Sequence, residues 1–98
     1  MRRFYVSLSF KVIYSEIALR QLKKLDKQTS KRLMTWIGER LINCSNPRLW
    51  GKALQGSVLG ENWCYRVGDY RILCNIQDEK ILILIAGLGH RKEVYKEK

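Results

Sequence analysis

Two strands joined by a two-residue turn restrict the fold of this chain more than any other feature of its sequence. Residues 63–77 alternate between apolar and other side chains, and only Gly68 and Asp69 interrupt the pattern. This spacing predicts an antiparallel hairpin in which Arg66 lies directly opposite Arg71. The other face of the hairpin is apolar and can pack under helices; it carries Trp63, Tyr65, Val67, Tyr70, Ile72 and Cys74.

The facing arginines suggest a binding surface. Like charges directly opposite each other destabilise a sheet, and Arg66 and Arg71 would stand roughly 5 Å apart at Cβ. The pair makes physical sense if a phosphate lies between the two guanidiniums, because each can form two parallel hydrogen bonds with its oxygens. We therefore expect an open, anion-binding face on the side of the hairpin away from the helices.

The remaining periodic segments predict an α+β fold. Residues 4–14 alternate as a half-buried strand, and residues 80–87 form a strand that is apolar on both faces and belongs in the interior of the sheet. Residues 15–25 and about 30–43 repeat apolar side chains at helical spacing. We predict an antiparallel four-stranded twisted sheet, with an N-terminal strand followed by two helices that pack on one face.

Two connections are predicted to be irregular. Residues 26–30 form the turn between the helices. Residues 43–60 contain the only proline and three of the seven glycines, and we expect Leu49, Trp50 and Leu54 to anchor this segment to the core.

Register counting extends the arginine face to the last strand. If Asp78 and Glu79 form a two-residue turn, Arg71 lies opposite Ala86, whose small side chain leaves room beside the arginine. Counted further along the strand, His90 falls on the same face as Arg71.

The C-terminal residues would then complete a cluster at the hairpin tip. Arg91 follows His90 directly, and the chain end can fold back to bring Tyr95 near. A β-bulge at Gly87 or Gly89 would shift these positions by one residue.

The charge balance indicates a polyanionic partner. The chain contains 19 Lys and Arg against 9 Asp and Glu, which gives a formal net charge of +10. Such a surface attracts RNA, DNA, an acidic protein or anionic lipid. The length of 98 residues predicts a single domain over residues 1–98.

Other chemistries are disfavoured by composition. A single histidine without a nearby carboxylate cluster argues against a metal, and we expect no cofactor. The chain lacks a credible nucleophile and base pair for Ser, Cys or Thr catalysis. The apolar run at residues 81–88 is too short to span a bilayer, and we find no signal peptide. Three widely spaced cysteines are typical of reduced thiols in a cytoplasmic protein; they are Cys44, Cys64 and Cys74.

Four short stretches form a recognisable combination: YSEIA leading into LKKL at residues 14–25, WCYRVGDYRI at 63–72, DEK at 78–80 before an aliphatic strand, and HRKEVY at 90–95. Together they resemble the RelE/ParE toxin superfamily of bacterial toxin–antitoxin pairs. The RVGDYR hairpin with a late HRxxVY is the pattern of the RelE side of the superfamily. The resemblance begins at about Lys11, so the first ten residues look like an N-terminal extension of the first strand.

The resemblance implies a function and a set of partners. RelE-like toxins are small ribonucleases that enter the ribosomal A site and cut the mRNA there, which inhibits translation. The chain would thus be a type II toxin and a metal-independent endoribonuclease. Its partners would be a RelB-like acidic antitoxin, the ribosome with mRNA in the A site, and operator DNA through a higher-order toxin–antitoxin complex.

The resemblance also implies site residues. The catalytic set would be Arg71, Arg91, Tyr95 and His90, and the RNA and phosphate contacts would come from Arg66, Arg71 and Lys92. Where some RelE toxins have a lysine two residues before the position of Arg66, this chain has Cys64. That departure leaves open which group moves protons here.

Cleavage of RNA without a metal requires a base for the 2′-hydroxyl, positive charge on the phosphorane oxygens and an acid for the departing 5′-oxygen. Arg66 and Arg71 suit the charge role. His90 can act as base or acid because its unperturbed pKa is near neutrality, and Tyr95 could stack on a base or take the proton. Arg91 could bind the phosphate or support the leaving group.

Two other functions stay open at this point. A ParE-like toxin would inhibit DNA gyrase by binding it and would need no catalytic site. A non-enzymatic RNA-binding module would expose aromatic side chains for stacking, whereas Trp63, Tyr65 and Tyr70 fall on the predicted core face.

Overall fold

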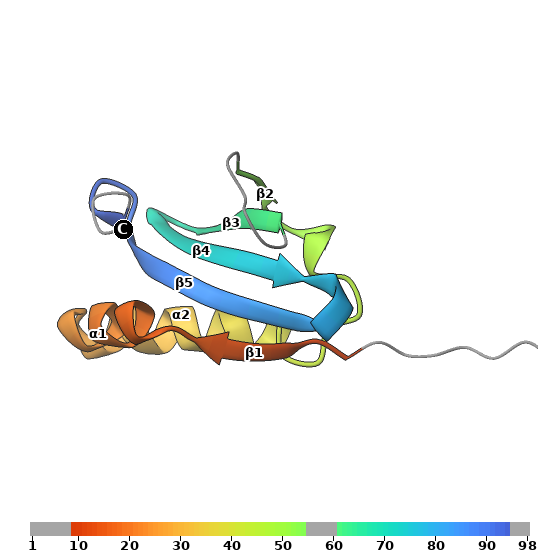
Figure 1. Cartoon of the computed structure of the whole chain (residues 1–98). Helices are drawn as coiled ribbons and strands as arrows, with labels where there is room; N and C mark the ends of the chain where they lie inside the picture. The colour runs from red at the N-terminus through yellow and green to blue at the C-terminus, as the bar shows by residue number, and fades with distance from the viewer. Residues whose placement is uncertain (1–8, 55–60, 95–98) are drawn as a thin grey trace, which may run out of the picture.

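The computed structural model describes residues 9–54 and 61–94. Two layers make up the fold, a five-stranded sheet and two helices that cover one side of it (Figure 1). In chain order the elements are β1 (Lys11–Tyr14), α1 (Glu16–Lys24), α2 (Lys27–Arg40), a short 3₁₀ helix (Pro47–Leu49), β2 (Lys52–Ala53), β3 (Glu61–Val67), β4 (Tyr70–Gln77), a second 3₁₀ helix (Asp78–Lys80) and β5 (Leu82–His90).

The sheet differs in two respects from the predicted antiparallel four-stranded one. Its strand order is β1-β5-β4-β3-β2, and β1 runs parallel to β5. The additional strand, β2, spans only Lys52–Ala53 and pairs with β3, and two residues are too few to show a periodic pattern. The α+β class, the two helices on one face and the interior position of β5 agree with the prediction.

The first strand is shorter than the predicted residues 4–14, because β1 covers Lys11–Tyr14 and Ser9 and Phe10 are not in a strand; residues 4–8 lie outside the described residues. Ser15 joins this strand to the first helix as predicted. Phe10 is buried, while Val12 and Tyr14 pack against the core from β1. The Ser15 hydroxyl caps α1 by accepting a hydrogen bond from the Ala18 N–H at 3.0 Å. The start of α1 is therefore set by a capping serine that can be recognised from the sequence alone.

The second helix begins earlier than predicted. Residues 26–30 are not a turn, because Asp26 is the N-cap of α2 and its carboxylate accepts from the Thr29 N–H at 3.1 Å and from the Thr29 hydroxyl at 2.7 Å. These hydrogen bonds lower the pKa of Asp26. The helix also ends at Arg40 rather than near Asn43.

The core lies between the helices and the sheet face that was predicted to be apolar. Its largest fully buried members are Tyr65, Leu33, Ile37, Leu41, Ile72, Ile76, Ile83, Ile85, Leu88, Val94 and Pro47. The Tyr65 hydroxyl donates to the Pro47 carbonyl at 2.6 Å, which ties the irregular connection to β3. Trp50 packs against the core as predicted and Leu54 is half-buried, but Leu49 is 66% exposed and anchors nothing.

Candidate functional site

The tip of the β3–β4 hairpin has the predicted register. Val67 pairs with Tyr70 and Arg66 with Arg71, and the turn adopts a left-handed conformation at Gly68, where φ is 61°. The two arginines lie on the face of the sheet that is turned away from the helices, because the alternate residues of both strands form the core face. The facing pair expected from the sequence is present.

The Arg71 side chain folds back over its own turn. Its Nη1 atom donates to the carbonyl of Gly68 at 3.0 Å and to that of Tyr70 at 3.1 Å. Arg66 is exposed and Arg71 half-buried. Within the described part of the chain neither guanidinium forms an ion pair with a carboxylate. The charge of this pair is thus available to an incoming anion.

A third arginine lies at the same tip and was missed by the sequence analysis. A Cβ atom placed on Gly68 would lie 2.7 Å from Arg32 Nη2, so the Arg32 guanidinium contacts the turn from α2. Contacts between a helix and a distant hairpin have no local signal.

The register of β5 is not the predicted one. Arg71 pairs with Gly89 rather than Ala86, and His90 pairs with Tyr70. One cause is the Asp78–Lys80 3₁₀ helix, which replaces the two-residue turn and ends with Ile81 in a left-handed conformation at φ 50°.

A β-bulge is the second cause. Leu73 pairs with Gly87 and Cys74 with Ile85, so Ala86 is the extra residue, and its carbonyl accepts from the Ser15 hydroxyl at 2.9 Å. The 3₁₀ turn shifts the register by two residues, and the bulge shifts it by one more. Because side chains alternate across a strand, a shift by an odd number of residues moves His90 to the opposite face. The predicted sharing of one face by His90, Arg71 and Ala86 is therefore wrong.

Instead, His90 packs against Tyr70. The two ring centroids are 5.6 Å apart with an interplanar angle of 82°. His90 Nδ1 accepts a hydrogen bond from the Lys92 N–H at 3.1 Å, so the proton of the neutral ring is on Nε2, which can donate a hydrogen bond to a ligand. Both rings line a pocket of about 370 Å³ beside α1, which also involves Lys24 and Glu93.

Gln21 is a second residue that the sequence analysis missed. Its side chain is buried, and its Oε1 atom accepts from the Leu88 N–H at 2.7 Å. A Cβ at Gly87 would lie 3.3 Å from the same oxygen. Gln21 thus fastens α1 to β5 just before His90, at the point where β1 no longer pairs with that strand.

The segment after β5 returns to the hairpin tip. The Arg91 N–H donates to the Asp69 carbonyl at 2.8 Å, and the Glu93 N–H donates to the His90 carbonyl at 2.8 Å. The Arg91 and Lys92 side chains are exposed. The structure therefore brings the backbone of Arg91 to the turn between Arg66 and Arg71. Tyr95, the remaining predicted catalytic residue, lies outside the described residues.

Burial changes the pKa of several titratable groups in and next to the core. Burial raises the pKa of Tyr65 and that of the Cys74 thiol well above their ordinary values, and it also raises the pKa of Tyr14. Cys64, which stands where some RelE toxins have lysine, is buried on β3. Among residues 9–54 and 61–94 there is no group of His, Cys, Asp or Glu side chains that could hold a metal ion.

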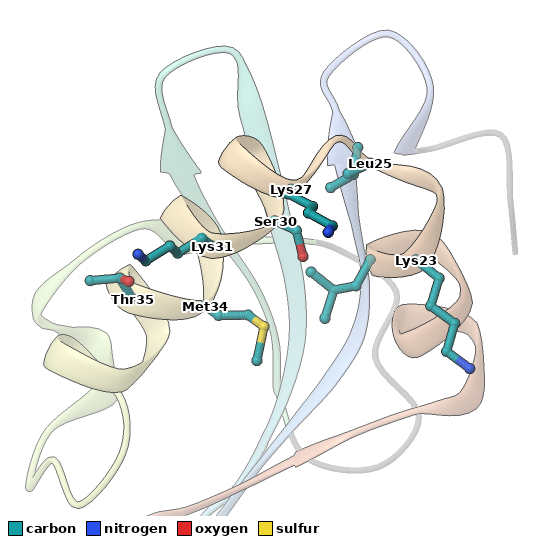
Figure 2. Close-up of a pocket in the computed structure, with 8 residues that line it drawn as sticks. Lys23, Leu25, Lys27, Ser30, Lys31, Met34 and Thr35 are labelled. Carbon is teal, nitrogen blue, oxygen red and sulfur yellow. The ribbon is translucent and has the colours of Figure 1, made fainter.

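A pocket of about 510 Å³ lies between the two helices (Figure 2), and neither arginine of the facing pair lines it. Leu22, Leu25 and Met34 supply its apolar part, and it is bordered by Lys23, Lys27 and Lys31. The described residues that line it include no histidine, aspartate or glutamate. This groove fits the binding of another molecule better than proton transfer. No helix of the described residues is both long and apolar enough to cross a membrane.

Residues 12–95 match the family model of the ParE toxin of the type II toxin–antitoxin system parDE. The chain belongs to this family, within the RelE/ParE superfamily. It is a type II toxin with a RelE-like structure. No curated protein matches it in sequence.

Solved structures of RelE proteins resemble most of this chain. The toxin–antitoxin complex RelBE2 of Mycobacterium tuberculosis matches with a TM-score of 0.74 and 27% identity, over 88% of this chain and 95% of that one. The isolated RelE toxin of E. coli matches with a TM-score of 0.66 and 25% identity, over 91% of this chain and 94% of that one. The intact E. coli RelBE complex matches with a TM-score of 0.67 and 22% identity, over 84% and 96% of the two chains.

Proposed function

We propose that this toxin is a metal-independent, ribosome-dependent endoribonuclease that cleaves mRNA in the A site and thereby inhibits translation. The observation that carries the proposal is the facing pair Arg66 and Arg71, with the Arg91 backbone bound to the same turn at 2.8 Å. Four arginines lie around this hairpin tip: Arg66, Arg71, Arg91 and Arg32. The facing pair has no carboxylate partner among the described residues, which suits a phosphate whose charge increases during reaction.

The cleavage step requires a balanced transfer of protons. A base removes the proton of the 2′-hydroxyl, the 2′-oxygen bonds to phosphorus, and the 5′-oxygen leaves with a proton from an acid. The products are a 2′,3′-cyclic phosphate and a 5′-hydroxyl. Arg66 and Arg71 stabilise the phosphorane oxygens in this scheme, and Arg91 with Lys92 holds the neighbouring phosphate or the leaving group.

Two residues are candidates for the proton transfers. His90 is one of them, but its Nδ1 already accepts from the Lys92 N–H, and its ring lies on the face of Tyr70 rather than that of Arg71. RNA would have to pass around the end of the sheet to reach both groups. Tyr95 is the other candidate. Such a site lacks an efficient base beside the arginines, so it depends on a substrate held in a reactive geometry, which is the part we assign to the ribosome.

The test is a translation reaction in which mRNA 5′ ends are mapped after addition of the toxin. We expect codon-phased cuts with the wild type and their loss with Arg71→Ala and with Arg91→Ala. Arg20→Ala, which removes an exposed arginine from α1, is the matched control and should leave the cuts in place. Variants that still block translation fully but make no cuts would contradict the catalytic assignment.

A ParE-like activity is the second candidate, and the description of the matching family model favours it. A gyrase inhibitor would block DNA supercoiling and leave mRNA intact. In a supercoiling assay with purified gyrase we expect no inhibition by this toxin. Inhibition of supercoiling together with intact mRNA would replace the nuclease proposal.

The partner that we propose is a RelB-like acidic antitoxin. The related solved structures include complexes of RelE with RelB, and the net charge of +10 favours an acidic chain here. The interhelical groove offers an apolar floor with a border of lysines to such a segment. Together the pair would bind operator DNA as a higher-order complex, and the toxin would act in the cytoplasm, where the ribosomes are.

A further inference from the structure

A second cationic hollow adjoins the arginine pair at the outer edge of β3. Its volume is about 490 Å³, and it lies between α2, the segment that leads into β2, and β3. Its chemistry comes from three cations and two indoles: Arg40, Lys52, Arg66, Trp36 and Trp50. We call this hollow the edge pocket.

The edge pocket gathers positive charge from three different elements. Arg40 is on α2, Lys52 on β2 and Arg66 on β3, and no Asp or Glu is among the described residues that line the pocket. Glu39 Oε1 lies 3.9 Å from Arg40 Nη1, and the side chains of Arg40 and Glu39 are 41% and 69% exposed. An exposed pair at this distance offsets little charge. The clustered cations therefore favour an anionic ligand.

The aromatic part of the edge pocket is held in place. The Trp36 and Trp50 rings meet edge to face at a centroid distance of 6.4 Å, and the Arg40 guanidinium lies 5.2 Å from the Trp36 ring centroid. The Trp50 carbonyl accepts from the Trp63 indole N–H at 2.6 Å.

Backbone contacts fix the same segment. Gly51 has a φ of 76°, and a Cβ there would overlap the Cys64 carbonyl oxygen. Glycine thus lets this segment approach β3 closely, which positions the half-buried Trp50 ring beside the cations.

We propose that the edge pocket binds the nucleotide next to the scissile one in a single-stranded RNA. Arg40 and Lys52 hold its phosphate, and its base stacks on Trp50. The inference rests on the proposed function through Arg66, which belongs both to the facing pair and to the edge pocket. An RNA strand whose phosphate lies between Arg66 and Arg71 reaches the edge pocket by continuing across β3.

The test measures binding of the full-length toxin to 2′-O-methyl RNA oligonucleotides of increasing length by fluorescence anisotropy. Methylation blocks the attacking hydroxyl, so binding is observed without cleavage. The edge variant is Arg40→Gln with Lys52→Gln. Its control is Arg20→Gln with Lys80→Gln, which removes the same two charges from exposed positions elsewhere.

We expect the edge variant to bind roughly tenfold more weakly for each charge-assisted hydrogen bond that it can no longer make. The slope of log K against log salt should decrease by about 0.7 for each phosphate that the variant no longer binds. The wild type should gain affinity when the oligonucleotide becomes long enough to enter the edge pocket, and the edge variant should not. The control should keep both the length dependence and the tighter binding.

An edge variant that binds RNA as the control does would overturn the inference. Cuts made by the wild type and lost in Arg71→Ala would then show that the nuclease proposal survives alone. If the same edge variant also forms a weaker antitoxin complex, the edge pocket would be assigned to a protein partner. A wild type that neither binds nor cuts RNA would instead refute the proposed function itself.

Discussion

Arginines lie near both ends of β4, but their electrostatic surroundings are opposite. Near Gln77, Arg48 donates two hydrogen bonds to the Asp78 carboxylate, at 3.0 and 2.8 Å, and its guanidinium lies 5.8 Å from the Trp63 ring centroid. At the other end, Arg66 faces Arg71, whose guanidinium donates to backbone carbonyls. At the first end, the Asp78 carboxylate balances the charge of Arg48 without a ligand. We propose that the second gains stability when an anion binds, and that the difference between the two ends therefore separates a structural arginine from a functional one.

The largest expected effect is on activity at the facing pair. Arg71→Ala should lower the rate of RNA cleavage by at least about 100-fold, the usual cost of removing one group that stabilises a developing oxyanion. Its unfolding midpoint in urea should stay at or above that of the wild type, because the repulsion between two like charges is removed. Arg48→Ala is the matched control and should keep the wild-type cleavage rate. Equal losses of activity in the two variants would remove the distinction between the two ends.

The next effect concerns how the functional end is held in place. Gln21→Leu removes the acceptor of the buried Leu88 N–H, which should lower the free energy of unfolding by about 1–3 kcal/mol. Gln28→Leu changes an exposed position on α2 and serves as its control. Urea unfolding of both variants measures the difference. If the two variants are equally stable, the link between α1 and β5 does not contribute to the structure as we describe it.

A smaller effect is expected from the turn itself. Gly68→Ala should lower stability by about 1–2 kcal/mol, because alanine is strained in the left-handed region and its Cβ would displace Arg32. Gly38→Ala should instead raise stability by about 0.5–1 kcal/mol, since Gly38 is in α2 and a Cβ there meets nothing within 4 Å. Thermal unfolding of the two variants compares these signs directly. A stabilising effect of Gly68→Ala would contradict the left-handed conformation of Gly68.

The smallest effect is the pH dependence at the structural end. Hydrogen bonds from Arg48 lower the pKa of Asp78 below its ordinary value of 3.8. Because the folded pKa is depressed, this contribution is present above the unfolded pKa and is lost as the pH falls through the folded one. Arg48→Gln should therefore reduce stability near neutral pH by less than about 1 kcal/mol, and the difference from wild type should disappear in acid. A difference that persists in acid would mean that the packing of Arg48 on Trp63, rather than the ion pair, carries its contribution.

The same two ends show how far the sequence predicts the site. The Arg66 and Arg71 pairing followed from two turn residues, because a two-residue loop fixes register locally. The position of His90 could not follow, since it depends on a 3₁₀ turn and on a bulge at Ala86, whose carbonyl is bound by Ser15 from a distant part of the chain.

Tertiary contacts account for the other differences. Arg32 reaches the hairpin tip and Gln21 reaches Leu88 only because the helices pack where they do. The edge pocket likewise assembles from three elements that no spacing in the sequence relates. By contrast, Asp26 followed by Thr29 is a local capping signal that was available and was overlooked.

The most direct measurement is an end-group analysis of mRNA cut in a single turnover on purified ribosomes, with the wild type and with Arg66→Ala combined with Arg71→Ala. We predict 2′,3′-cyclic phosphate and 5′-hydroxyl ends with the wild type and no such ends with the double variant. Cleavage by the double variant at the wild-type rate, or 5′-phosphate ends from the wild type, would contradict the assignment of RNA cleavage to the facing arginines.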